Sequence, residues 1–134
     1  MVANDLVRPN GLASNPNSSI LYVSDTGYIT GKVDAALPRT IYAYDVSDPQ
    51  QTFLQNRRVF AYCDTGIPDG LKVDNANNVW AGCGDGLNVW NAKGQLIGKI
   101  LIKGGVSNFV FTASPKISLI VILNEYRILS TALN

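Results

Sequence analysis

The stretch RPNGLASNPNSSILYVSDTG, residues 8–27, has a later counterpart in IPDGLKVDNANNVWAGCGDG, residues 67–86. Each copy is read as a loop, a short apolar strand, a polar turn and a second strand. The copies differ at one informative position, because Asp69 of the PDG motif stands where the first copy has Asn10 of the PNG motif. Self-similarity of this kind indicates a fold built from repeated units.

Apolar and aromatic runs separated by turn residues recur along the chain, and no stretch shows a convincing helical period. The runs are rich in Val, Ile, Tyr, Phe and Trp, and sequences such as DNANN, GDG and NAKGQ lie between them. Besides the strand after the PNG motif, the predicted strands are 20–25, 40–46, 57–63, 70–74, 78–83, 86–91, 95–101, 107–113, 118–123 and 126–131. The sequence therefore predicts an all-β chain.

The spacing of these strands predicts antiparallel four-stranded meanders, each of them one blade of a β-propeller. Residues 8–66 are read as one blade, with the insertion TGYITGKVDAALPR between its second and third strands. Residues 67–103 are read as the next blade, and residues 104–134 as a unit that stops after about three strands. Residues 1–134 are thus interpreted as one partial propeller domain of about two and a half blades.

The segments PNGLA, PDGLK and VSNFV occupy equivalent places, where the chain begins an innermost strand. Because the first strand of each propeller blade lines the central channel, residues at its start converge near the axis. We therefore expect Asn10 and Asp69 to be neighbours at a shared central site. The alternative is that both side chains only satisfy turn backbone, as Asn and Asp beside Gly often do.

Composition excludes several classes of function. The chain has 134 residues, is 46% hydrophobic and carries a net charge of +1, which suits a compact domain or a piece of a larger one. Without a run of Lys or Arg, it has no electrostatic footprint for nucleic acid or a membrane surface, and its apolar runs are far shorter than the roughly 20 residues of a membrane helix. The absence of histidine excludes Ser-His-Asp and Cys-His catalysis and imidazole metal ligands. The first residues lack a signal-peptide pattern, and cytoplasmic and secreted locations both stay open.

The two cysteines, Cys63 and Cys83, each end an apolar run and lack metal-type spacing. We expect two buried free thiols, and a disulfide between them is the alternative if the protein is secreted.

Other polar and aromatic positions favour structural roles. The segment DNANN, which begins at Asp74, predicts a hairpin turn, because it lacks the glycine and terminal Glu of a calcium loop. Asp25 either caps a turn or faces the channel mouth. Trp80 and Trp90 lie on predicted strands and are expected to pack between blades, and Glu125 has no assigned role.

Five segments follow one another along the chain: RPNGLA, LYVSDTG, IPDGLKVD, NVWAGCGDGLNVWN and NFVF. In this order they resemble the SMP-30, gluconolactonase and luciferin-regenerating-enzyme family, particularly its fungal lactonohydrolases. The resemblance extends through about Phe111. It implies a six-bladed propeller with a divalent cation on its axis, usually Ca²⁺, with Mg²⁺, Zn²⁺ or Mn²⁺ as alternatives. It also implies that Asn10 and Asp69 bind the metal, that Asp69 activates a water, and that the reaction hydrolyses a small-molecule lactone.

The chain departs from that family pattern. The family's Glu ligand from the first blade has no counterpart here, and the segment TASPKISLIVILNEYRILSTALN lacks the expected glycine-containing turn. We expect an incomplete propeller that is a poor enzyme alone and whose exposed blade edges drive self-association into a homo-oligomer. The alternatives are a non-catalytic propeller scaffold and a half-propeller that pairs with a second copy.

Overall fold

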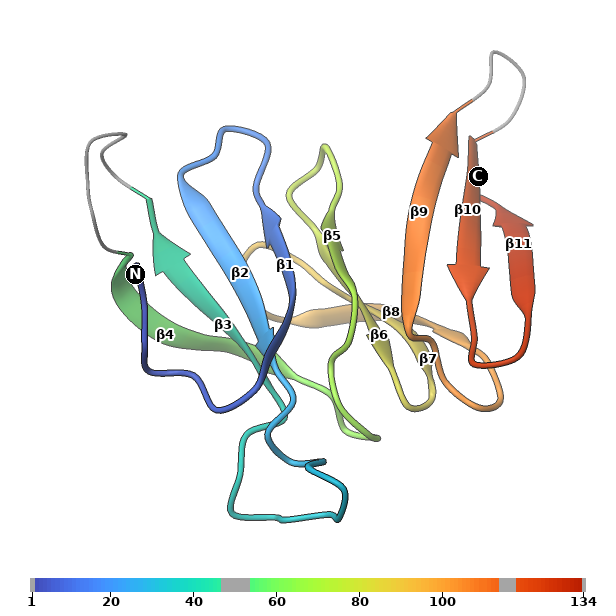
Figure 1. Ribbon diagram of the computed structural model, residues 1–134. Helices are drawn as coiled ribbons and strands as arrows, with labels where there is room; N and C mark the ends of the chain where they lie inside the picture. Colours follow the sequence, from blue (N-terminus) through green and yellow to red (C-terminus); the bar gives the residue numbers. More distant parts are fainter. Residues whose placement is uncertain (1, 47–53, 114–117, 134) are drawn as a thin grey trace.

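The computed structural model describes residues 2–46, 54–113 and 118–133, and in these ranges the chain is all-β without a helix (Figure 1). Accordingly, no described helix has the length and apolarity needed to cross a membrane. The strands are β1 (Pro9–Ser14), β2 (Ile20–Asp25), β3 (Thr40–Asp45), β4 (Gln55–Tyr62), β5 (Leu71–Val73), β6 (Val79–Cys83), β7 (Gly86–Trp90), β8 (Leu96–Leu101), β9 (Asn108–Ala113), β10 (Ser118–Leu123) and β11 (Ile128–Ala132). The all-β prediction is confirmed.

In the described ranges, three antiparallel sheets follow chain order. The first sheet is β1-β2-β3-β4, the second sheet is β5-β6-β7-β8, and the third sheet is β9-β10-β11. The predicted insertion forms the connection between β2 and β3, residues 26–39. Strand β11 begins at Ile128, later than predicted, because Asn124 N–H donates to the Arg127 carbonyl at 2.9 Å and closes a turn there.

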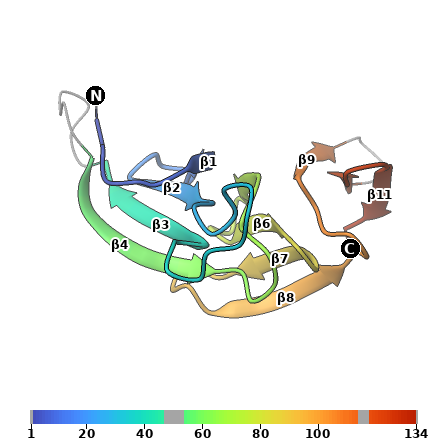
Figure 2. The same ribbon diagram turned by 60° about the horizontal axis from the view of Figure 1, so that its bottom comes forward.

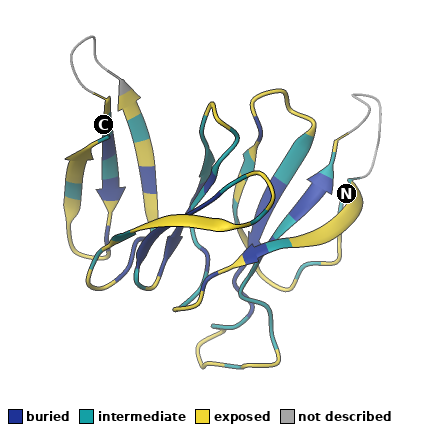
Figure 3. Cartoon of the chain, turned by 180° about the vertical axis from the view of Figure 1, so that it is seen from behind, coloured by how far each residue is buried: buried dark blue, intermediate teal, exposed yellow. Residues whose placement is uncertain are grey.

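The sheets stack side by side and bury apolar side chains between them (Figure 2). One cluster, which includes Tyr22, Ile41 and Trp90, fills the space between the first and second sheets. A second cluster, which includes Leu87 and Ile120, joins the second and third sheets. Because both faces of the second sheet are covered, β7 is buried along its whole length, whereas the outer strands β4 and β8 are mostly exposed (Figure 3).

Aromatic packing accounts for both tryptophans. Trp90 is buried between the first two sheets, and the Trp80 ring meets Phe111 edge to face with centroids 5.4 Å apart. The predicted packing role of both residues is confirmed.

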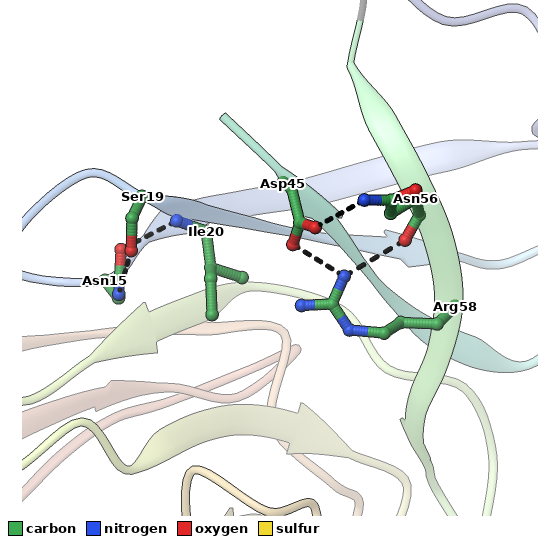
Figure 4. Close-up of polar contacts among 6 residues, drawn as sticks. All are labelled: Asn15, Ser19, Ile20, Asp45, Asn56 and Arg58. Carbon is green, nitrogen blue, oxygen red and sulfur yellow. Dashed lines mark hydrogen bonds and ion pairs between the residues drawn. The ribbon is translucent and has the colours of Figure 1, made fainter. Parts of the chain in front are cut away.

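Polar side chains fix one end of the first sheet (Figure 4). The side-chain oxygen of Asn15 accepts the Ile20 N–H at 2.9 Å and closes the turn between β1 and β2. At the same end, where Asp45 pairs with Ile20, the Asp45 carboxylate accepts hydrogen bonds from Asn56 Nδ2 at 2.8 Å and from the Arg58 guanidinium at 2.7 Å. These contacts hold β4 against β3 where the register shifts.

Glycines in the two repeated motifs allow the first strands of neighbouring sheets to approach closely. Strand β1 contacts β5, and β5 contacts β9. A Cβ atom at Gly11 would collide with the Asp69 carbonyl oxygen, and one at Gly70 would lie 2.5 Å from the side-chain oxygen of Asn108. The glycine of each motif is therefore required by the distance between strands.

Cys63 and Cys83 form a disulfide, and the expectation of two free thiols is wrong. Cys63 follows β4 in the first sheet, whereas Cys83 ends β6 in the second. Packing of the two sheets brings their Cα atoms to 5.9 Å, within the range that a disulfide spans. Spacing along the chain carries no signal of this pairing, because the two residues meet only through the contact between sheets.

The disulfide should contribute measurably to the free energy of unfolding. Replacing both residues by alanine should lower the free energy of unfolding, because the bridge joins residues 20 positions apart and restricts the unfolded chain. The expected loss is about 3 kcal/mol, measured by urea unfolding. Reduced wild-type protein should match the double variant, and an unchanged urea midpoint would contradict the argument.

Candidate functional site

Asn10 and Asp69 lie side by side although they are 59 positions apart in the chain. Asn10 is in β1, and Asp69 lies just before β5. The Asn10 Nδ2 group donates a hydrogen bond to Asp69 Oδ1 at 2.7 Å. The proximity expected from the repeat is therefore present, while the role of the pair as metal ligands stays a prediction.

The backbone around Asp69 is held from both neighbouring strands. The Asp69 N–H donates to the Gly82 carbonyl at 2.8 Å, and the Gly70 N–H donates to the Ser107 carbonyl at 2.9 Å. The carboxylate is thus presented by a fixed segment between the second and third sheets.

Ser24 is a positioning residue that sequence reasoning missed. This fully buried side chain accepts the Gly11 N–H at 2.7 Å and donates to the Asp69 carbonyl at 3.0 Å. One hydroxyl therefore links the backbones of the PNG and PDG motifs. The available signal was a hydroxyl residue directly after the apolar run ILYV of β2, where a buried polar group requires partners.

Burial raises the pKa of the Asp69 carboxyl above its ordinary value, and the hydrogen bond from Asn10 opposes this shift. The ion pairs found in the described ranges do not involve Asp69. A half-buried carboxylate in this setting is stabilised by a cation. The Asn10 amide oxygen and the Asp69 carboxylate are the donor types that Ca²⁺ and Mg²⁺ prefer, so the pair fits a hard divalent ion.

A cleft of about 170 Å³ opens beside Asp69. Ser107 and Glu125 line it together with Asp69, which gives Glu125 a place that the sequence did not assign. Asn10 is not among its lining residues. In the described ranges, no cluster of three or more His, Cys, Asp or Glu side chains that would hold a metal is present.

Lys72, on β5, is a second residue that sequence reasoning missed. Its Nζ group donates to the Asn108 side-chain oxygen at 3.2 Å and lies 5.4 Å from the centre of the Phe109 ring. Burial lowers the pKa of the Lys72 ammonium. The lysine links β5 to β9, close in sequence to Asp69.

Asp25 and Asp74 serve turns. The Asp25 carboxylate accepts the Gly27 N–H at 3.1 Å, which corresponds to the turn-cap alternative, and it also accepts the N–H groups of Val7 at 2.8 Å and Arg8 at 2.9 Å. The Asp74 carboxylate accepts the Asn78 N–H and the indole N–H of Trp80, each at 2.9 Å. The predicted hairpin turn at Asp74 is confirmed.

Stacked antiparallel sheets whose first strands approach one another place this chain among the all-β proteins built from repeated sheets. Residues 1–122 match the family described as the SMP-30/gluconolactonase/LRE-like region. The chain belongs to this family.

Individual relatives agree with this assignment. Lactonohydrolase oryH of Aspergillus oryzae is 31% identical over 125 residues, which cover 83% of this chain and 26% of the relative. Gluconolactonase of Zymomonas mobilis is 32% identical over 106 residues, which cover 75% of this chain and 28% of that protein. The structure of a gluconolactonase from Xanthomonas campestris matches with a TM-score of 0.73 and 36% identity, over 90% of this chain and 36% of that one. The chain therefore spans only 26% and 28% of these two enzymes.

The raised pKa of Asp69 predicts that the stability of the metal-free fold decreases as pH rises. A raised folded-state pKa means that this carboxyl contributes stability below its unfolded pKa, and that the contribution is lost as pH rises through the folded pKa. In the presence of chelator, Asp69→Asn should raise the melting temperature at neutral pH, and the two proteins should converge as pH falls. Asp34→Asn, which retains the acceptor for the Ala36 N–H, is the control. A melting temperature for Asp69→Asn below that of wild type at neutral pH would refute this assignment of charge.

Proposed function

We propose that this chain is part of a metal-dependent lactonase with a six-bladed β-propeller fold, in which Asn10 and Asp69 hold the divalent cation. The observation that carries the proposal is the 2.7 Å contact between these two side chains from successive sheets, in a chain of the gluconolactonase family. Ca²⁺ is the preferred ion for amide and carboxylate oxygens, and Mg²⁺, Zn²⁺ and Mn²⁺ are the alternatives.

The arrangement of the sheets supports the propeller. Each four-stranded sheet is a meander whose first strand touches the first strand of the next sheet, and each sheet packs on its neighbour by one face. In a propeller the first strands line the central channel in this way. On this account the first and second sheets are two complete blades, and β9-β10-β11 are three strands of a third.

In the proposed reaction, a water oxygen attacks the lactone carbonyl carbon, the ring C–O bond breaks, and the leaving alkoxide gains a proton to give a hydroxy acid. A bound divalent cation supplies polarisation of the carbonyl and acidifies water. Asp69 accepts the proton from the attacking water, which is the role of a general base. Asn10 orients that carboxylate through its Nδ2 hydrogen bond, and Ser24 holds the backbone on which both depend.

The third sheet has an exposed apolar face that could contact a partner. Val110, Leu123 and Ile128 are 49%, 46% and 75% exposed, on the side of the sheet turned away from Phe109 and the second sheet. Such a face suits another sheet packing on it, as in a propeller. Self-association of this chain through the face stays a prediction.

The activity predicts chelator-sensitive hydrolysis of lactones. With a panel of aldonolactones and aromatic lactones, Asp69→Asn in a complete propeller that contains this chain should lower kcat/KM by roughly 100-fold or more, because a general base contributes that much. The assay follows acid release with and without chelator, and Asp34→Asn is the matched control. Turnover by Asp69→Asn equal to that of wild type would show that this carboxylate is not catalytic.

A further inference from the structure

A second cleft lies between the first and second sheets and shares no lining residue with the cleft beside Asp69. Its volume is about 310 Å³, at the lower end of the roughly 300–1,000 Å³ typical of small-molecule sites. Strand β4 supplies Phe60 and Tyr62, and β7 supplies Asn88 and Trp90. Tyr62 is 56% exposed, so the cleft is open to solvent.

Asn88 is the unusual residue of this cleft. Side chains alternate along a strand, and Leu87 packs toward the third sheet while Trp90 packs toward the first, so Asn88 points toward the first sheet. The side chain is 1% exposed, and its Oδ1 atom has no hydrogen-bond partner. A buried acceptor without a donor is destabilising, and residues that break a local packing rule concentrate at functional sites.

Neighbouring charges define what this acceptor would bind. Lys99, paired with Asn88 across β7 and β8, forms ion pairs with Asp85 at 2.8 Å and with Asp64 at 3.6 Å. Asp64 lines the cleft and its side chain is 62% exposed, which leaves acceptor capacity for a ligand. Among the described residues, Lys99 is engaged by the two carboxylates, and the Arg39 guanidinium donates to the Asp64 carbonyl at 3.1 Å. The Asn88 Oδ1 atom and the exposed Asp64 carboxylate are therefore the polar groups left to bind a ligand, and both are acceptors. A ligand must donate hydrogen bonds, and an anion is disfavoured.

We propose that this cleft binds a neutral polyhydroxy compound of monosaccharide size. One hydroxyl donates to Asn88 Oδ1 and another to the Asp64 carboxylate, while the ring C–H groups lie against the aromatic side chains of Phe60 and Tyr62. Hydroxyl groups supply donors without adding charge to a cluster where Lys99 and Arg39 together balance the two aspartates. The proposal does not depend on the lactonase activity, because it uses none of the residues at the Asp69 site.

The test is an NMR titration of the isotope-labelled full chain with D-glucose. Glucose should cause saturable shifts in the Asn88 side-chain amide, the Trp90 indole and the Asp64 backbone. Asn88→Leu should weaken binding by at least about tenfold, the effect of one lost hydrogen bond in a buried site, while its melting temperature equals or exceeds that of wild type. Asn75→Leu, the same substitution on an exposed turn, should change neither.

Two further variants complete the test. Asp64→Asn replaces an exposed side chain, removes its 3.6 Å ion pair with Lys99, and should weaken glucose binding if Asn88→Leu fails to fold. Asp69→Asn should bind glucose as wild type does. The proposal is overturned if glucose shifts resonances around Asp69 instead, if propylammonium chloride binds in place of glucose, or if Asn88→Leu binds normally. Two results together would also overturn the proposal: a lower melting temperature in Asn88→Leu, and no saturable glucose shifts in wild type. They would show that the Asn88 amide is structural and that one ordered water satisfies its Oδ1 atom.

Discussion

The approach of β1 to β5 is the contact on which the rest of the structure depends. Gly11 lies against the Asp69 carbonyl with no room for a Cβ atom, and the Ser24 hydroxyl ties both backbones together. This spacing places Asn10 within hydrogen-bond distance of Asp69. A larger residue at Gly11 would separate the strands, and the two candidate ligands would no longer reach one ion.

Farther from these strands, the same two sheets are joined by different forces. Tyr22, Ile41 and Trp90 bury apolar surface between them, and the Cys63–Cys83 disulfide links them covalently near the end of β6. Because the bridge begins the loop that leads to Asp69, it also limits how far that loop can move. Without a metal, the Asp69 carboxyl, whose pKa is raised by burial, lowers the stability of the fold at neutral pH. Apolar burial and the disulfide therefore preserve a geometry that the polar site alone would not hold.

Much of this architecture is readable from the sequence, for physical reasons. Strand β2 was predicted at its observed bounds because its apolar run is flanked by turn residues, and Asn10 and Asp69 were paired because a repeat puts equivalent residues in equivalent places. The disulfide was missed because it depends on the contact between sheets. Ser24 and Asn88 were missed because a lone polar residue in an apolar strand does not reveal its partners.

The central claim is that Asn10 and Asp69 together bind a divalent cation, and calorimetric titration with Ca²⁺ tests it most directly. The wild-type chain should bind Ca²⁺ saturably. Asp69→Ala should abolish the heat of binding, because it removes the carboxylate, and Asn10→Ala should weaken binding while the fold persists. Equal Ca²⁺ affinity in wild type and Asp69→Ala, with both proteins folded, would contradict the account.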